Sequence, residues 1–416
     1  MRKSAVNKGI SLVLILIMVI SIIVPQKSVE AATNSNIKIY NFIKLLVPAA
    51  GIEVDTSQGS PYLKAAMDAG IVKEGDFKDY KAYLTRMDAA VLLNRADEYI
   101  HGDTVDKELL KTVTEKRISD IKKIPAGKRE AVAKIYAKGF IVGKSNGMYV
   151  QNRSFNGADY LAAGDAKKVL ALLKNVKDRA KMSPDGQLIR TTNLPKNAKD
   201  YPYILEAFPN SFYEMKFSYQ RGTYSWKPVE GKDYASPSKI TTAMDAIKTD
   251  ETGKCIYVND WMKKIEDNIK YRFNVNYHTI DNIWLNNLRR TYFVANAASL
   301  DKDQTDKIRE YIKYVKKNQV TITSSIISVE PSTLYKHIGG YQVRVYVKFK
   351  ISLINVNNEE NLNNLFFGNT RFVDLSNNKW FAGVYDIEIG TKNIGSDGSD
   401  FAVSDDTLND FYYKGK

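Results

Sequence analysis

The residue types that most often carry catalysis are present in this 416-residue chain, but it contains no Gly-x-Ser-x-Gly motif, no phosphate-binding glycine loop and no His-Glu-x-x-His motif. The three histidines, His101, His278 and His337, are far apart and lack the spacing of metal ligands. The one cysteine, Cys255, lies in a short predicted strand, residues 254–258, where a buried hydrophobic role is commoner than a nucleophilic one. We therefore predict no catalytic residue, no metal and no cofactor, and we expect that the protein is not an enzyme.

The spacing of Thr85, Arg86 and Asp88 indicates the start of a helix. Apolar residues follow at helical spacing, so a helix is predicted to begin here. Thr85 is placed to cap that helix, and Asp88, three residues later, completes a capping-box arrangement. Arg86 would then lie at the start of that helix.

The predicted helix behind these residues belongs to a repeated pattern of helix, glycine stop, short apolar segment, turn and second helix. One copy spans residues 60–101 and another spans residues 117–176, while residues 36–52 fit only the second helix of a copy. Gly70 and Gly139 are predicted to end the first helices, because a left-handed cap residue is best without a side chain. Such units cannot bury their apolar faces alone, so we expect them to pack on one another.

Four segments carry a family resemblance: Ile118-Ser119-Asp120-Ile121, Gly139-Phe140-Ile141-Val142-Gly143, Asn146-Gly147-Met148-Tyr149 and Leu84-Thr85-Arg86-Met87-Asp88. They resemble the opening, the centre and the Thr-Arg-Ala-Glu segment of the S-layer homology repeat. The resemblance covers about residues 36–176 and implies a pseudo-threefold helical bundle of three repeats. It also implies that grooves between repeats bind an anionic secondary cell-wall polysaccharide, often pyruvylated, with Thr85, Arg86 and Asp88 as the polysaccharide-binding residues. In that case the Arg86 guanidinium at the helix start would bind a carboxylate, because its forked donors and the N–H groups of the helix start both favour one. The alternative is a capped helix with a solvated Arg86.

Only one of the three units keeps the threonine and the arginine of that segment. In the last unit we align Asn156-Gly157-Ala158-Asp159 with it, and in the partial first unit we align Lys38-Ile39-Tyr40-Asn41. Neither segment carries an arginine. The resemblance therefore implies at most one intact groove.

The N-terminus is typical of an exported protein. Three basic residues within the first eight precede an apolar run over residues 10–24, and small residues follow up to Ala32. The run is shorter than the roughly 20 apolar residues of a spanning helix, so we predict a signal peptide over residues 1–31. The alternative is an uncleaved membrane anchor. No integral membrane segment is predicted after cleavage.

The formal net charge of the chain is +14, and most of the cationic excess of the exported chain lies in residues 32–182. Outside a cell such a surface attracts anionic partners, for example wall polymers or lipid headgroups. No compact cluster of basic residues indicates nucleic acid. With the resemblance, these features predict a secreted protein at the cell wall or S-layer surface of a Gram-positive bacterium; the oligomeric state is not predicted.

The second half of the chain matches no family that we recognise. Turn-forming residues over residues 181–200 predict a linker between a repeat domain, residues 33–180, and a second domain, residues 201–416. That domain is predicted to be α+β with an antiparallel sheet. Its predicted helices are residues 259–273, 280–288 and 303–317, and its predicted strands are residues 212–219, 320–329, 341–351 and 379–389. Its tyrosines form either a core or a sugar-stacking face: Tyr271, Tyr277, Tyr292, Tyr335, Tyr341 and Tyr346.

Three functional hypotheses follow. The first is a surface protein attached non-covalently to the wall through its repeats and displaying a binding or structural domain. The second is an extracellular hydrolase of wall glycan on the same anchor, since paired carboxylates cannot be recognised in one sequence. The third is a secreted adhesin or assembly protein whose degenerate repeats serve only as a scaffold.

Overall fold

The computed structural model of the chain describes most of both halves of the sequence. The described residues are 35–57, 59–216, 258–293, 298–337, 340–352, 365–368, 377–391, 400–404 and 412–413. The chain divides into two compact units: the first unit contains residues 1–100 and 158–176, and the second unit contains residues 101–157 and 177–416. The predicted signal peptide and Cys255 lie outside the described residues.

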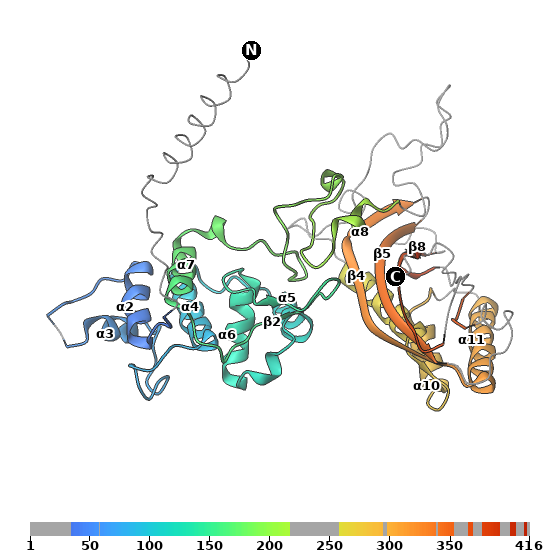
Figure 1. Cartoon of the computed structure of the whole chain (residues 1–416), viewed down its shortest axis with the longest axis horizontal. Helices are drawn as coiled ribbons and strands as arrows, with labels where there is room; N and C mark the ends of the chain where they lie inside the picture. Colours follow the sequence, from blue (N-terminus) through green and yellow to red (C-terminus); the bar gives the residue numbers. More distant parts are fainter. Residues whose placement is uncertain are drawn as a thin grey trace, which may run out of the picture. The chain divides into compact units, whose positions relative to one another are not determined.

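The first unit is helical. Its helices are α2 (Ile39–Ala49), α3 (Pro61–Asp68), α4 (Arg86–His101) and α7 (Ala163–Lys174) (Figure 1). Each of the three longer helices buries one apolar stripe, for example Phe42, Ile43 and Leu46 on α2. These residues recur at helical spacing, which is why the pattern predicted helices here.

Three short extended segments, which lead into α2, α4 and α7, are joined by a closed ring of backbone hydrogen bonds. Ile37 N donates to Leu161 O at 2.9 Å, Leu161 N donates to Leu84 O at 2.8 Å, and Leu84 N donates to Ile37 O at 2.9 Å. The side chains of these three residues are buried. The backbone N–H and C=O groups of all three residues therefore find partners in neighbouring segments.

A second ring of hydrogen bonds surrounds the first and joins the opening residue of each helix to the next segment. Its bonds are Ile39 N to Ala82 O (3.0 Å), Arg86 N to Asp159 O (2.8 Å) and Ala163 N to Ser35 O (2.9 Å). Ile39, Arg86 and Ala163 thus occupy equivalent positions. The rings fix how the three segments align with one another.

This alignment corrects the sequence alignment of the last unit. The position equivalent to Arg86 is Ala163, whereas the alignment had placed Gly157 there. Asn156, at φ 54°, and Gly157 lie in the loop before the extended segment. The length of that loop could not be counted from the sequence. The alignment of Lys38-Ile39 with Thr85-Arg86 agrees with the rings.

The second unit begins with a helical part. Its elements are α5 (Lys107–Thr112), the π-helical turn η1 (Val113–Arg117), the 3₁₀ turn η2 (Ile121–Lys123), α6 (Ala126–Ala137) and a small hairpin of β1 (Lys144–Ser145) and β2 (Arg153–Ser154). Gly139 ends α6 at φ 73°, and Gly70 follows α3 at φ 71° in the first unit. Both glycine stops predicted from the sequence are confirmed.

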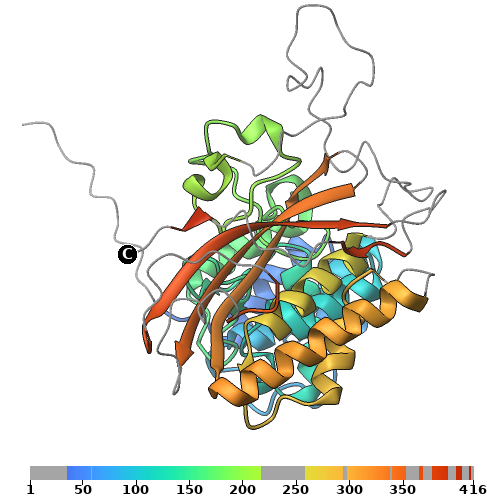
Figure 2. The same ribbon diagram turned by 90° about the vertical axis from the view of Figure 1, so that its right-hand side faces the viewer.

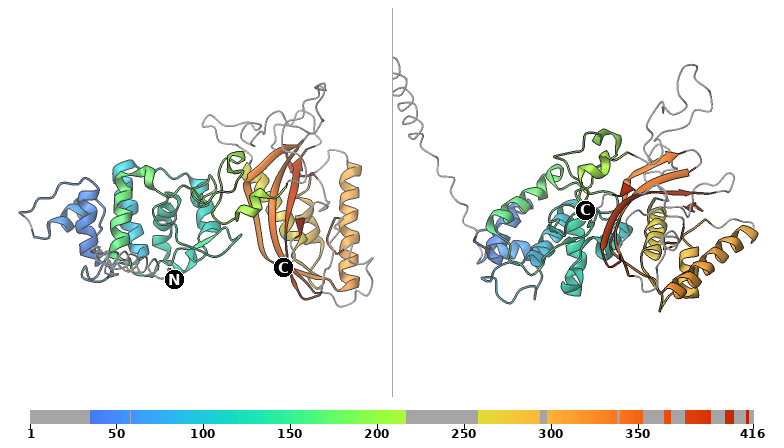
Figure 3. Two further views of the ribbon diagram at one scale, coloured as in Figure 1. Left: turned by 45° about the horizontal axis from the view of Figure 1, so that its top comes forward. Right: turned by 45° about the vertical axis from the view of Figure 1, so that its right-hand side comes forward.

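The rest of the second unit is α+β, as predicted. Its helices and turns are η3 (Val176–Asp178), η4 (Ala198–Asp200), α8 (Asn210–Glu214), α9 (Val258–Arg272), α10 (Asn282–Arg289) and α11 (Ala298–Asn318). Its strands are β3 (Val275–Asn276), β4 (Thr321–His337), β5 (Gly340–Ser352), β6 (Trp380–Gly390), β7 (Ala402–Val403) and β8 (Tyr412–Tyr413). The strands form one antiparallel sheet in the order β3-β4-β5-β6-β7, with β8 paired to β6. The long strands curve strongly (Figure 3).

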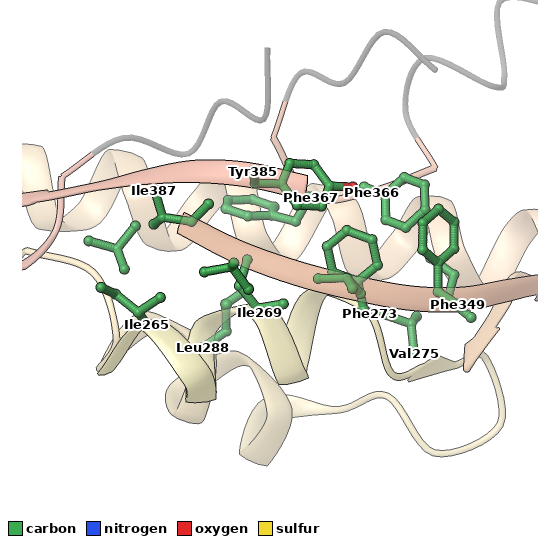
Figure 4. Close-up of a cluster of buried hydrophobic side chains, with 14 of the residues drawn as sticks. Ile265, Ile269, Phe273, Val275, Leu288, Phe349, Phe366, Phe367, Tyr385 and Ile387 are labelled. Atoms are coloured by element: carbon green, nitrogen blue, oxygen red, sulfur yellow. The ribbon is translucent and has the colours of Figure 1, made fainter. Parts of the chain in front are cut away.

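Helices α9, α10 and α11 lie on one face of this sheet (Figure 2). Ile265, Ile269 and Phe273 lie four residues apart on α9 and face Phe349 and Tyr385 from the strands (Figure 4). All five side chains are buried, and burying each contributes about 1.5–3 kcal/mol. The predicted amphipathic helix over residues 259–273 is confirmed.

Part of the opposite face of the sheet is covered by residues 201–216, which differ from the prediction. Residues 212–219 were predicted to be a strand, but Phe212 and Tyr213 belong to α8, and residues 217–219 lie outside the described residues. Arg344 of β5 donates to the carbonyl oxygens of Phe212 (3.0 Å) and Met215 (2.9 Å). This contact comes from a residue distant in sequence, which no local pattern reveals.

Residues 181–200, predicted as a linker, belong to the second unit. Ser183 and Gln187 are buried, and Asp185 accepts a hydrogen bond from Arg117 Nη2 at 2.7 Å. Gly186, at φ 78°, makes the turn that its sequence indicated. Turn-forming residues mark a reversal of the chain, and a reversal inside a domain has the same composition as a linker.

Candidate polysaccharide-binding site

The start of α4 has the capping arrangement predicted from the sequence. Thr85 Oγ1 donates to Asp88 Oδ2 at 2.6 Å, and Asp88 N donates to Thr85 Oγ1 at 3.2 Å. Both residues are half-buried. Their side chains are thus committed to the helix start, which leaves direct ligand contact at this place chiefly to Arg86.

Arg86 is half-buried, and its backbone N–H lies in the outer ring of hydrogen bonds. The residue also interacts with other groups of the chain. Among the three equivalent positions it is the cationic one, since the others hold Ile39 and Ala163. Lys38, at the position equivalent to Thr85, is exposed and supplies a second cation on the partial first unit.

Two aromatic residues that the sequence analysis did not single out lie beside these cations. Tyr83 and Tyr160 are 49% and 55% exposed, and their ring centroids are 5.6 Å apart. Each occupies the position just before the buried ring residue of its segment, Leu84 or Leu161. The recurrence of tyrosine would have revealed the pair had the last unit been aligned as the rings show. Exposed aromatic rings with a hydroxyl group are suited to stacking on sugar rings.

The charge around these helix starts is mixed. Asp159 precedes Tyr160 and is exposed, and Asp165 lies in the first turn of α7. Asp165 forms an ion pair with Lys168, with Oδ1 and Nζ 3.1 Å apart. The helix starts therefore carry both signs of charge, with Arg86 and Lys38 as the cations and Asp159 and Asp165 as the anions.

A depression of about 410 Å³ lies between α2 and α7 of the same unit. Leu45 and Ala49 of α2 and Leu170 of α7 line its apolar part, while Lys167 and Lys174 lie at its edge. Both lysines are exposed. The depression therefore combines apolar surface with positive charge.

The loop after Gly70 is held by a residue of α4. Arg95 donates to Ile71 O at 3.0 Å and to both carboxylate oxygens of Asp76. Burial acts to raise the pKa of Asp76, but hydrogen bonds from Arg95 and from Lys73 N, with the positive charge of Arg95, hold that pKa below its ordinary value. Arg95 is thus structural and faces the loop of its own repeat.

The repeat in the second unit uses the aspartate of its opening segment as a loop anchor. Asp120 accepts hydrogen bonds from Phe155 N at 2.7 Å and from Asn156 N at 2.8 Å. Arg153 donates to Val142 O at 2.8 Å and pairs with Glu206 at 2.7 Å. These contacts explain why an Ile-Ser-Asp-Ile opening and a glycine-rich centre occur together in one repeat.

Among the described residues, no helix is long and apolar enough to cross a membrane. In the same residues, no group of three or more His, Cys, Asp or Glu side chains is arranged to hold a metal ion.

Comparison with known proteins identifies one part of the chain. The S-layer homology domain matches residues 117–156, which confirms the resemblance there, and the C-terminal half has no family match. The match lies in the second unit and does not include Thr85, Arg86 or Asp88.

Whole-chain comparisons add little to this. No curated protein matches the chain. Among solved structures, the undecaheme cytochrome from the S-layer of Carboxydothermus ferrireducens is similar at 13% sequence identity and a TM-score of 0.23, over 40% of this chain and 20% of that chain. A likeness at this TM-score carries no argument about fold or function.

Proposed function

We propose, from the S-layer homology match of residues 117–156, that this chain is an exported surface protein held non-covalently to the cell wall of a Gram-positive bacterium by its repeats. The ligand in this proposal is an anionic secondary cell-wall polysaccharide, with pyruvylated sugars as one source of its charge. The α+β part is displayed as a binding or structural domain. The chain has no catalytic role in this proposal.

The observation that carries the proposal is the pair of closed hydrogen-bond rings at the starts of α2, α4 and α7. Rings of this kind support a pseudo-threefold arrangement of the three repeats, in which equivalent residues face equivalent surroundings. The proposal places the ligand at these helix starts, where the helix dipoles favour an anion.

The residues proposed to contact the polysaccharide are those that the rings bring together. Arg86 offers two parallel donors to a carboxylate, and Lys38 supplies a second positive charge. Tyr83 and Tyr160 offer stacking surface for the sugar. Thr85 and Asp88 fix the helix start and so position Arg86. A charge-assisted contact from Arg86 would contribute about 1.5–3 kcal/mol.

The test uses the full exported chain, residues 32–416, because a shorter chain ending near residue 182 would lack Asp185, the ion-pair partner of Arg117. The protein is incubated with purified wall sacculi, either intact or stripped of their secondary polymer. We expect retention on intact sacculi only. Equal retention on stripped sacculi would exclude the polymer as the ligand.

Two variants locate the site. Arg86→Ala should weaken retention on intact sacculi about tenfold or more, and a Tyr83→Ala/Tyr160→Ala double variant should weaken it further. Arg290→Ala is the matched control, because Arg290 is an exposed arginine of the second unit and its loss changes the net charge equally. Retention that Arg86→Ala and Arg290→Ala reduce to the same extent would reject the proposed site.

Cell fractionation separates this proposal from a secreted protein with a degenerate scaffold, which would be recovered from the medium. A zymogram on wall glycan tests the absence of catalysis. Clearing by the protein would replace the proposal with an anchored hydrolase.

A further inference from the structure

The face of the sheet opposite α9, α10 and α11 is divided into two regions. In the first region, Arg344, Tyr346 and Val384 lie under Tyr149 and residues 201–216. Tyr149 stacks on Tyr346 with ring centroids 3.6 Å apart and an interplanar angle of 3°. This region is an interior surface of the second unit.

The second region lies further along the same strands. Thr323 pairs with Lys350, and Lys350 pairs with Trp380, so the three residues form one row across β4, β5 and β6. Directly paired residues of antiparallel strands lie on the same face. Lys348 lies in the next row of that face, and Asn378 lies just before β6. We call Thr323, Lys348, Lys350, Asn378 and Trp380 the Trp380 patch.

The Trp380 patch exposes an aromatic ring where the first region buries its rings. Trp380 is 47% exposed, whereas Trp261, on the other side of the sheet, is 1% exposed. The strand residues next to the patch in sequence, Phe349 and Phe381, point into the core and are buried. Strand alternation therefore places Trp380 outward by register, and a solvent-facing tryptophan on a strand is an available stacking surface.

Two lysines flank this ring. Lys348 Nζ lies 5.9 Å and Lys350 Nζ lies 5.4 Å from the centroid of Trp380, within the range of cation–π attraction. Within the part of the chain that the structure describes, neither ammonium group forms an ion pair. Lysines on α11 differ, since Lys302 pairs with Asp306 and Lys313 pairs with Glu310.

The edge of the patch is polar and fixed. Asn378 N donates to Ile351 O at 2.8 Å, and Ser352 Oγ donates to Asn378 Oδ1 at 2.6 Å. Asn378 and Thr323 are both exposed, so the edge of the patch carries an amide and a hydroxyl group. The patch therefore combines an aromatic surface, two cations and neutral hydrogen-bonding groups.

We propose that the Trp380 patch is a second glycan-binding site, specific for an acidic sugar. One sugar ring stacks on the indole of Trp380, and its carboxylate or phosphate lies beside the ammonium groups of Lys348 and Lys350. Thr323 and Asn378 contact the sugar hydroxyls. A nucleic-acid strand could also stack on the ring, but it requires a track of cations along its backbone, which two lysines beside one ring do not supply. This site is separate from Arg86 and does not depend on the proposed function of the first unit.

Isothermal titration calorimetry on the full exported chain tests the proposal with four probes. Trigalacturonate supplies a carboxylate on the sugar, and a phosphorylated mannose oligomer supplies a phosphate. Cellotriose has sugar rings without charge, and a short oligothymidine represents nucleic acid. We expect one or both acidic oligosaccharides to bind at least tenfold more tightly than cellotriose, and the comparison of the two identifies the acid. Tighter binding of oligothymidine, or equal binding of cellotriose, would overturn the proposal.

The variants assign that binding to the patch. Trp380→Ala should weaken binding of the acidic oligosaccharide about tenfold or more, and so should the double variant Lys348→Gln/Lys350→Gln. The matched control is Lys302→Gln/Lys313→Gln, which removes the same charge from α11. If Trp380→Ala unfolds, the lysine pair decides. Unchanged binding in the folded variants, or an equal loss in the control, would refute the site.

Two crossed measurements separate this site from the first unit. Arg86→Ala should leave oligosaccharide binding to the patch unchanged, and Trp380→Ala should leave retention on sacculi largely intact. Loss of oligosaccharide binding in Arg86→Ala would assign the sugar to the first unit and overturn the inference.

Discussion

The loops that follow Gly70 in the first unit and Gly139 in the second unit have the same sequence pattern but different surroundings. A Cβ atom at Gly70 would meet nothing within 4 Å, whereas one at Gly139 would overlap the carbonyl oxygen of Ala180. Ala180 N donates to Gly139 O at 3.1 Å, and Arg179 lies over the ring of Phe140. The same sequence pattern therefore leaves space beside the glycine in one unit and fills that space in the other.

The ion pairs of the two units differ in the same way. The side chains of Arg95 and Asp76 in the first unit are 22% and 19% exposed. Those of Arg344 and Asp386 in the second unit are 0% and 1% exposed. The ion pair of the first unit is partly open to solvent, while that of the second unit is enclosed. Tertiary packing, more than the repeat pattern, sets how strongly each residue is constrained.

The largest expected effect is on the enclosed ion pair. Arg344→Ala leaves Asp386 buried without its partner and also removes the donors to Phe212 and Met215, so we expect a loss of about 3–5 kcal/mol of unfolding free energy. Arg95→Ala in the first unit should cost about 1–2 kcal/mol, because solvent reaches Asp76. Denaturant unfolding, with hydrogen exchange to assign each transition to a unit, measures both. Similar losses would remove the contrast between the units.

The next largest effect is on the glycine stops. Gly139→Ala should cost about 3 kcal/mol or more, since an alanine at positive φ costs about 1–2 kcal/mol and the overlap with Ala180 adds to it. Gly70→Ala should cost only about 1–2 kcal/mol for an alanine at positive φ, because no atom lies close to the added Cβ. The same unfolding experiment compares the two. If Gly70→Ala and Gly139→Ala lower the free energy of unfolding equally, the positive φ alone sets the cost and the overlap with Ala180 does not contribute.

A pH-dependent effect is expected from Glu330 in the second unit. Burial raises the pKa of Glu330 from 4.5 to about 8, against hydrogen bonds from Ser332, Tyr213 and Thr333 N. Between those two pH values the folded state keeps a proton that the unfolded state loses. The free energy of unfolding therefore falls by about 1.4 kcal/mol for each unit by which the pH rises. The fall ends once the folded carboxyl ionises. Glu330→Gln should remove this slope between pH 6 and pH 8, and an unchanged slope would contradict the assignment.

The smallest effect has the opposite sign and concerns Asp76 in the first unit. Its folded pKa is lowered, so its contribution is complete above the ordinary pKa of 3.8 and is lost as the pH falls through the folded value. We expect about 1 kcal/mol to be lost below pH 4. Arg95→Ala should flatten this acid response, measured by thermal unfolding at two acidic pH values. An acid response that persists in Arg95→Ala would assign it to other carboxyls.

Local pattern was sufficient for much of the fold. Residues 259–273 and 341–351 were predicted correctly, since their apolar residues follow the helical and the strand period and both elements bury that face. The capping of α4 was also predictable, because Thr85 and Asp88 bond within one turn.

Features set by distant residues could not be predicted in this way. The strand assigned to residues 212–219 failed because Arg344 holds the carbonyl groups of α8. The place of Ala163 opposite Arg86, and so the pairing of Tyr83 with Tyr160, depends on hydrogen bonds between segments far apart in the chain. The six tyrosines offered a core and a sugar-stacking face as alternatives. Tyr292, Tyr335 and Tyr341 are buried, as expected for a core.

The two separated stretches of chain that make up the first unit constrain the order in which the protein can form. Synthesis delivers Ile37 and Leu84 early, but Leu161 emerges only after residues 101–157. Until then the apolar stripes of α2 and α4 lack α7 as a packing partner. The segment that carries Leu161 and α7 could also come from a neighbouring copy and form the same hydrogen bonds. Domain swapping of this segment is therefore the assembly error to which the first unit is most exposed.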